Sequence, residues 1–292
     1  VTTTMSASTA TAALVSRPAC AASGARGSTS ASRRSALRRG PAPSRAVVED
    51  AVEVKLDPRK AGLALQLDDG TRKSHSMAEN SAFVTGFFRG IAEKKYFAQL
   101  VADLYFVYQA MEDSFEHSED ANVRTLDYPE LRRVPSLEAD MEYYFGAEWR
   151  GAVSPSRATA KYVARVREVA KDTPHLLLAH QYTRYLGDLF GGQMMGGMAT
   201  RSLGLENGKG IAFYNFEEIP SAKEFIGGWY SKLNALELTT AQKEEIVDEA
   251  NLVFRLNIEL FDELDGNPAA AVFKLALDAL KEKLGLNKTV AA

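Results

Sequence analysis

The sequence has little cysteine: Cys20 is its single thiol, and it lies in a segment unlike the rest of the chain. Residues 1–48 contain no Asp or Glu, and their basic residues are seven arginines among many Ser, Ala and Thr. This composition is typical of an organelle transit peptide, and a disordered tail without targeting meaning is the alternative. We therefore expect residues 1–48 to be a disordered transit peptide, directed to the chloroplast stroma rather than the mitochondrion.

Without that segment the chain would have no thiol at all, which excludes disulfides, zinc–thiolate sites, iron–sulfur clusters, cysteine nucleophiles and thiolate-ligated heme. It would carry 28 basic and 38 acidic residues, a formal charge of −10. A nucleic-acid partner is not expected, because it requires a basic stripe. No run of 18 apolar residues occurs, so no membrane span is expected. A nucleotide-binding fingerprint is also missing, so electrons for any redox chemistry must come from another protein.

After residue 55, apolar residues recur at helical spacing almost everywhere, and strand-like alternation is nearly absent. The main strand candidate is the segment 210–216. Turn-forming residues predict breaks near Asp68–Gly70, Ser118–Val123, Val134–Pro135, Ser154–Pro155, Thr173–Pro174, Gly204–Gly210 and Gly266–Pro268. These breaks predict about seven or eight helices in one all-α domain over residues 55–265. An amphipathic C-terminal helix at 268–287 would dock on the domain or bind a surface.

One predicted helix contains glycine repeatedly. Within Leu176 to Gly204, five glycines interrupt strongly helical flanks: Gly187, Gly191, Gly192, Gly196 and Gly197. Each costs about 1 kcal/mol relative to alanine, so together they cost on the order of a whole domain's stability. Backbone contact with a flat ligand, a kink or close helix packing could each compensate, and the spacing alone favours none of them.

The polar neighbours favour a pocket. At about 100° per residue, five residues share one face of this helix: His180, Arg184, Gly187, Asp188 and Gly191. An Arg and an Asp on an otherwise apolar helix are unfavourable unless they are paired or hydrated. A pocket with ordered water would satisfy both.

Histidine offers a second candidate site. His75 and Glu79 are four residues apart and meet on one helix face. A carboxylate bound to one ring nitrogen leaves the other free to bind a metal, although such a pair is also common on plain surfaces. His180 is a rival because it shares the glycine face, whereas we expect His117 and His175 to be solvent-exposed.

Together, two motifs resemble the heme oxygenase family. The segment AHQYTRYLGDLFGGQ is similar to that family's distal helix, and TRKSHSMAEN is similar to its proximal-ligand motif. The resemblance continues through FVTGFFRG, LVADLYFVYQAME, ALELT and NLVFRLNIELFDEL, and covers about residues 62–265. The soluble algal and cyanobacterial type is the most similar. The resemblance implies a single all-α domain that holds heme between a proximal helix and a Gly-rich, kinked distal helix.

By this resemblance His75 is the proximal iron ligand and Glu79 its hydrogen-bond partner, which decides against His180 as the ligand. The distal backbone over the heme is formed by Gly187, Gly191 and Gly192. The catalytic water network is anchored by Asp188 and includes Tyr108, Arg184 and Asn257. Residues at positions that meet the heme propionates are Tyr182 and Arg72, with Lys232 as a further candidate.

The implied reaction is the O₂-dependent cleavage of heme to biliverdin, CO and ferrous iron, with heme as both substrate and cofactor. Reduced ferredoxin is the electron donor that a plastid would supply. A non-catalytic heme or bilin carrier on the same fold is the alternative, and retention of His75 and Asp188 argues against it. Thiamin-degrading relatives need a cysteine nucleophile, and di-iron relatives need Glu-x-x-His pairs that this sequence lacks.

Three features depart from the family pattern. Phe190 stands where the family usually has Ser, and Ile226 and Tyr230 stand where a Lys and an Arg usually meet the propionates. Asp68 and Asp69 occupy positions that are often basic. These differences bear on heme affinity and on the position of ring opening more than on the reaction itself.

An acidic ferredoxin would require a local basic patch on this acidic domain. The segments that could build one contain Lys94, Lys95, Arg132, Arg133, Lys161, Arg165 and Arg167. Ordinary solvated charges are the alternative for any one of these residues. On the helix that carries the last three, Lys161 and Arg165 would stack along one face.

Overall fold

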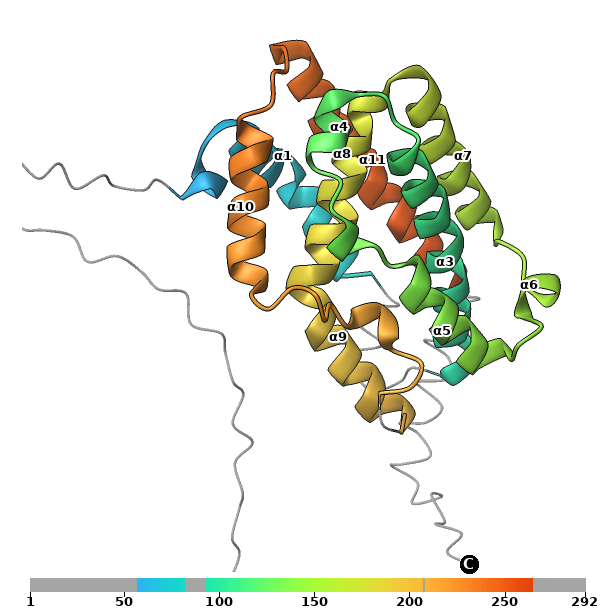
Figure 1. The fold of residues 1–292 in the computed structure, drawn as a ribbon. Helices are drawn as coiled ribbons and strands as arrows, with labels where there is room; N and C mark the ends of the chain where they lie inside the picture. The colour runs from blue at the N-terminus through green and yellow to red at the C-terminus, as the bar shows by residue number, and fades with distance from the viewer. Residues whose placement is uncertain (1–56, 82–83, 85–92, 207, 265–292) are drawn as a thin grey trace, which may run out of the picture. The chain divides into compact units, whose positions relative to one another are not determined.

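Helices and turns make up the regular structure, because apolar residues at helical spacing bury one side of almost every segment. The computed structural model describes residues 57–81, 84, 93–206 and 208–264. Its α-helices are α1 (Gly62–Glu79), α3 (Lys94–Glu116), α4 (Ala121–Thr125), α5 (Val134–Phe145), α6 (Trp149–Ala152), α7 (Arg157–Asp172), α8 (Leu177–His180), α9 (Gly187–Leu203), α10 (Ala222–Asn234) and α11 (Thr240–Leu264). The described residues include no strand, which confirms the all-α prediction (Figure 1).

Short turns connect these helices. Four are 3₁₀ turns: η1 (Pro58–Lys60), η2 (Pro129–Leu131), η3 (Pro174–Leu176) and η5 (Ala212–Tyr214). The fifth, η4 (Gln181–Leu186), is a π-helical turn between α8 and α9. Three of the four 3₁₀ turns begin with proline, whose fixed φ suits the first position of a helix.

The core is built around α3, which is buried over most of its circumference. It packs against α5 on one side and α7 on the other, and α11 packs along α1 (Figure 1). The α10 helix lies beside α1. Most of the predicted site residues lie on α1, α9 and α11; α11 contacts α1 directly, and it also contacts the η4 turn that leads into α9.

Most predicted breaks coincide with observed helix ends. Asp120 accepts hydrogen bonds from the Asn122 and Val123 amides at the start of α4, and Ser156 accepts one from the Thr159 amide at the start of α7. Gly204 ends α9 with a φ of 60°, a left-handed conformation that favours glycine. The predicted break at Gly266–Pro268 lies outside the described residues.

Two segment predictions are wrong. No break occurs at Asp68–Gly70, because α1 runs through it, and a Cβ on Gly70 would lie 2.5 Å from Val247 Cγ1 of α11. Gly70 therefore permits close packing of two helices rather than a turn. The segment 210–216 contains the 3₁₀ turn η5 instead of a strand.

Some predictions concern residues outside the described part of the chain: the transit peptide at 1–48 with Cys20, the segment FVTGFFRG for the most part, and the C-terminal helix at 268–287. They stay predictions, as do the domain limits. Along the residues that the structure describes, no helix has both the length and the apolar character needed to cross a bilayer.

Candidate functional site

The glycine-rich helix is continuous with the helix before it, but one turn between them is irregular. Residues Leu177–Leu203 run as α8, the π turn η4 and α9 without interruption. Single π turns within α-helices are uncommon and are found mostly at functional sites. We predicted an irregularity at the glycines, whereas the structure places it just before them.

The glycines of α9 face two different environments. A Cβ built on Gly187 or Gly191 would meet nothing within 4 Å. On Gly192 it would lie 3.1 Å from Tyr214 Cδ1, and on Gly196 it would lie 3.0 Å from Tyr214 Cβ. The backbone of α9 is thus open at Gly187 and Gly191 and closely packed at Gly192 and Gly196, and contact of the open face with a flat ligand stays a prediction.

A polar cluster lies beside the open glycine face. Tyr108 of α3 donates a hydrogen bond to Asp188 Oδ2, and Arg184 Nη2 lies 3.7 Å from Asp188 Oδ1. Arg184 also donates to Tyr108 Oη at 3.3 Å and to Asn257 Oδ1 of α11 at 2.7 Å. The structure thus brings together all four residues that the sequence predicted as the catalytic network.

Burial determines the electrostatics of this cluster. Desolvation raises the pKa of the Asp188 carboxyl well above its ordinary value, because a carboxylate is disfavoured where water is scarce. Desolvation also lowers the pKa of Arg184, although a guanidinium remains charged in proteins. A carboxyl group whose pKa is raised in this way, beside an open backbone surface, is suited to donate a proton to a bound ligand.

His75 lies on α1 with its ring exposed on one side. Its Nδ1 is 3.5 Å from Glu79 Oε2, which confirms that the two side chains meet. The ring also makes an edge contact with Phe254 of α11, at 5.5 Å between centroids. Phe254 and Asn257 are one turn apart on α11, so this helix connects the His75 side of the site to the polar cluster.

The other histidines take different roles. His180 is fully buried, and its Nε2 lies 3.2 Å from Glu249 Oε1, so it belongs to an internal ion cluster. His117 is exposed at the end of α3, as predicted. The prediction that His175 is exposed is wrong, because its side chain is only 13% exposed and its Nε2 lies 2.9 Å from Glu245 Oε2.

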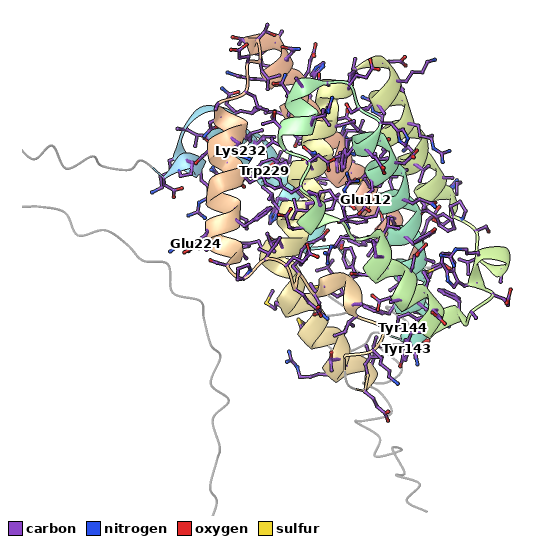
Figure 2. The ribbon with its side chains drawn as sticks, in the orientation of Figure 1. Glu112, Tyr143, Tyr144, Glu224, Trp229 and Lys232 are labelled. Atoms are coloured by element: carbon purple, nitrogen blue, oxygen red, sulfur yellow. The ribbon has the colours of Figure 1, made fainter. Side chains whose placement is uncertain are left out.

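The three residues predicted to meet heme propionates have different partners in the structure. Tyr182 is half-buried, with its ring 6.4 Å from that of Tyr230. Arg72 forms an ion pair with Asp69, one of the two acids that replace basic residues of the family pattern. Lys232 lies on α10, with its Nζ 4.7 Å from the centre of the Tyr128 ring (Figure 2).

Four of the seven basic residues predicted for partner docking are already engaged in ion pairs: Lys95 with Glu93, Arg132 with Asp127, and Lys161 and Arg165 on α7. Arg165 Nη2 lies 2.6 Å from Glu249 Oε2 and its Nη1 lies 3.0 Å from Glu168. Lys161 Nζ lies 2.6 Å from Glu259. Arg133 is buried, whereas Arg167 is exposed on α7.

Two large apolar side chains on α9 are exposed to solvent. Phe190 is 78% exposed and Met194, one turn later, is 59% exposed. Both lie on the same side of the helix as Gly187 and Gly191, given the helical spacing. An apolar strip of this kind beside open backbone is suited to a flat, apolar ligand. The sequence identified Phe190 as a departure from the family but did not identify Met194.

Comparison with known proteins identifies the family. A sequence model described as heme oxygenase matches residues 61–263. The heme oxygenase of Rhodella violacea is 43% identical over 206 residues, which are 70% of this chain and 88% of that protein. Heme oxygenase 1 of Synechocystis sp. is 44% identical over 228 residues, which are 78% of this chain and 95% of that protein.

Solved structures agree with the sequence comparisons. The crystal structure of heme oxygenase-1 from Synechocystis sp. in complex with heme matches with a TM-score of 0.70 at 44% identity, over 75% of this chain and 100% of that one. Its heme oxygenase-2, in complex with heme and NO, matches with a TM-score of 0.71 at 37% identity, over 76% of this chain and 93% of that one. The chain therefore belongs to the heme oxygenase family.

Proposed function

We propose that this protein binds heme between α1 and α9 and cleaves it, using O₂, to biliverdin, CO and ferrous iron. The observation that carries the proposal is the position of Asp188. Its buried carboxyl is bonded to Tyr108 and lies on the first turn of the helix whose open face is formed by Gly187 and Gly191. A flat ligand and a proton donor can therefore meet on one helix.

The residues fit heme from both sides. The open face of α9 is a surface that side chains at Gly187 and Gly191 would fill, so backbone can approach the macrocycle directly. On α1, Glu79 faces Nδ1 of His75, which leaves Nε2 to hold the iron. When bound, heme supplies the iron that activates O₂, and the protein supplies orientation and hydrogen bonds.

Proton delivery falls to the polar cluster. Burial raises the pKa of the Asp188 carboxyl, and Tyr108 and Arg184 hold that carboxyl in one orientation. Asn257 in turn fixes Arg184 through a 2.7 Å hydrogen bond. A positioned acid of this kind contributes about 10²–10⁴-fold to a rate.

We further propose reduced ferredoxin as the electron donor, in line with the expected import into the chloroplast stroma. The acidic domain would bind an acidic donor through a local basic patch. Lys161 and Arg167 on α7 are the pair to test. Both are exposed, and Glu259, the partner of Lys161, is half-exposed, whereas reversal of Arg165 would break its contact with the buried Glu249. Lys161→Glu combined with Arg167→Glu should raise the apparent KM for ferredoxin several-fold, and added salt should weaken the wild-type interaction.

The decisive experiment adds hemin to the full chain and then supplies ferredoxin, its reductase and NADPH. We expect the heme absorption band to disappear as biliverdin, CO and chelatable ferrous iron are released. Ascorbate without ferredoxin serves as the control for the donor. A stable complex that keeps its heme band through reduction in air would instead identify a heme carrier and refute the enzymatic proposal.

A further inference from the structure

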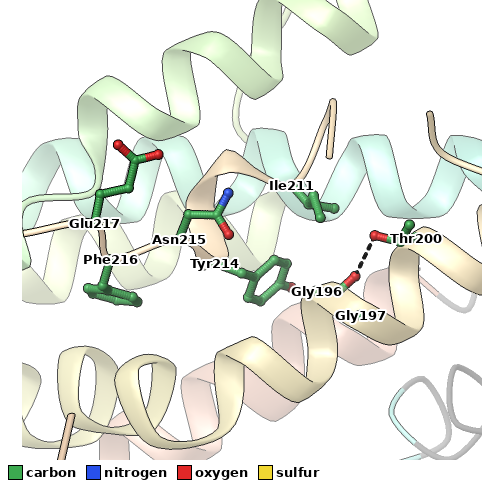
Figure 3. Close-up of a pocket in the computed structure, with 8 residues that line it drawn as sticks. All are labelled: Gly196, Gly197, Thr200, Ile211, Tyr214, Asn215, Phe216 and Glu217. Carbon is green, nitrogen blue, oxygen red and sulfur yellow. Dashed lines mark hydrogen bonds between the residues drawn. The ribbon is translucent and has the colours of Figure 1, made fainter. Parts of the chain in front are cut away.

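The short turn η5 touches the glycine helix at its packed face. Tyr214, the last residue of η5, lies against α9 at both Gly192 and Gly196, and Figure 3 shows its ring beside Gly196. No other heavy atom lies as close to the Cβ positions of these glycines as those of Tyr214. Tyr214 thus sets how near α9 can come to this side of the domain.

The preceding residue of η5 reaches the polar cluster. The Phe213 ring packs edge-on against the Tyr108 ring, at 5.2 Å between centroids. Tyr108 is the residue that donates to Asp188. One short turn therefore contacts the backbone of α9 through Tyr214 and the partner of Asp188 through Phe213.

A single 3₁₀ turn has few hydrogen bonds of its own, and here α5 holds it. The two oxygens of Asp140 accept one hydrogen bond each, at 2.8 Å, from the amides of Ala212 and Phe213. Asp140 is only 1% exposed. No other side chain is described as accepting from these two amides.

Arg133, the residue that precedes α5, binds the carbonyl groups of the same segment. Arg133 Nη1 donates to Asn215 O at 2.6 Å and to Phe213 O at 3.3 Å, and its guanidinium stacks on Phe216 at 3.9 Å. A buried acid and a buried base thus bind the donors and the acceptors of one turn. Burying both charges is unfavourable compared with apolar packing, so what they provide is a defined position.

The cavity beside the turn makes that position important. A cavity of about 410 Å³ lies between α9 and the segment that contains η5 (Figure 3). Its lining residues are Gly196, Gly197, Thr200, Ile211, Tyr214, Asn215, Phe216 and Glu217. Neither His75 nor Asp188 lines it. Tyr214 borders this space and is also the side chain that lies against α9 at Gly192 and Gly196.

We propose that Asp140 is a positioning residue for heme: by holding η5 it fixes Tyr214 against Gly192 and Gly196, and so fixes the height of Gly187, Asp188 and Gly191 over the ligand. This inference rests on the proposed function. It predicts that loosening η5 changes the heme environment although no residue near the heme is altered.

The test uses Asp140→Asn in the full chain. The NH₂ group of Asn cannot accept a hydrogen bond, so one of the two backbone amides loses its partner. Amide hydrogen exchange at Ala212 and Phe213 should therefore accelerate by about tenfold. Exchange in α9 should rise as well, whereas exchange in α7 should not. The absorption spectrum of the hemin complex should be followed as a function of pH. The midpoint of its pH-dependent change should shift by about half a unit or more, because Asp188 is displaced.

Two Tyr214 variants provide an independent comparison that remains informative if Asp140→Asn does not fold. Tyr214→Phe keeps the ring and should behave as wild type, whereas Tyr214→Ala should reproduce the spectral shift and the faster exchange in α9. A wild-type protein that fails to bind or cleave heme would refute the proposed function. If the wild type cleaves heme, and Tyr214→Ala has the same heme spectrum and the same hydrogen exchange in α9 as the wild type, the positioning role is refuted and the proposed function stands.

Discussion

Glu249 and Arg165 form an ion pair across two helices, with Nη2 of the arginine 2.6 Å from Oε2 of the glutamate, whose side chain is only 3% exposed. His180 Nε2 lies 3.2 Å from the other oxygen. Burial by itself would raise the pKa of Glu249, but the hydrogen bonds from His180 and Arg165 outweigh it and lower the pKa to about 2. This ion cluster links three helices: α7, α8 and α11.

The sign of the pH dependence follows from that lowered pKa. Because the folded-state value lies below the ordinary 4.5, the stabilisation is present above pH 4.5 and is lost as the pH falls toward 2. Glu249→Gln should therefore lower the free energy of unfolding by about 3 kcal/mol at pH 7, with the difference from wild type shrinking below pH 4.5. Urea titrations across this range would measure it, with Glu244→Gln, exposed on the same helix, as the control. An equal loss at pH 7 and pH 3.5 would contradict the assignment.

Gly191 and Gly196 should respond in opposite directions to alanine. At Gly191 the new methyl group meets open space, so Gly191→Ala should stabilise the free protein by up to about 1 kcal/mol, the usual helix preference. At Gly196 the methyl group would lie 3.0 Å from Tyr214 Cβ, so Gly196→Ala should destabilise it. Hemin titration should rank the two variants the other way: Gly191→Ala should lose more heme affinity than Gly196→Ala. The same sign of stability change for both variants would contradict the two-face description.

His75→Ala should remove the iron ligand without unfolding the protein, because the side chain is 56% exposed. We expect an altered ferric heme spectrum and loss of turnover, with external imidazole restoring part of both. His117→Ala is the matched control, since His117 is exposed at a helix end. If His180→Ala lost the ligand spectrum while His75→Ala kept it, the assignment would be wrong; we expect His180→Ala to lower stability instead, because it disrupts the Glu249 cluster.

Asp188→Ala should separate binding from catalysis. The carboxyl belongs to the proton-delivery cluster, so heme affinity should stay within about threefold while biliverdin yield falls by about 10²-fold or more. Asp188→Asn should give a similar loss, because the amide group has the shape of the carboxyl group but is not acidic enough to donate a proton. Product analysis by absorption and mass spectrometry would show this. Normal biliverdin yield from either variant would exclude Asp188 as the proton donor.

Phe190→Ser should test the departure from the family pattern. An exposed Phe beside the open glycine face gains contact with a bound macrocycle, so its loss should weaken heme binding by about tenfold, as expected for the burial of one aromatic side chain. Phe190→Leu should retain most of the affinity. Chromatography of the biliverdin isomers would show whether ring opening also changes position. Equal affinity in all three proteins would mean that Phe190 does not contact heme.

Local patterns in the sequence were enough to predict an all-α fold and the contact between His75 and Glu79. The resemblance to heme oxygenases also identified Asp188, Tyr108, Arg184 and Asn257, which the structure brings together. These predictions succeeded because helical spacing and sequence motifs are properties of short segments.

Other features depend on residues far apart in the chain and could not be predicted from spacing. Arg165 looked like a free surface charge, yet its partner Glu249 lies 84 residues away. The role of Gly196 depends on Tyr214, in a segment that was expected to be a strand. Asp140 had no signal in the sequence, because a carboxylate that binds the backbone of a distant turn belongs to no local motif.

The π turn at Gln181–Leu186 has a consequence for how this gene can vary in length. A turn closed by i→i+5 bonds holds one residue more than an α-helical turn. Deleting one residue within this turn would let it close as ordinary α-helix and leave the flanking residues in register, whereas deleting one residue from α8 would rotate every later residue by about 100°. Asp188 would then point away from Tyr108, and the open face at Gly187 and Gly191 would turn with it. The helix can therefore lose one residue within this turn, whereas the loss of one residue from α8 would turn the whole distal surface away.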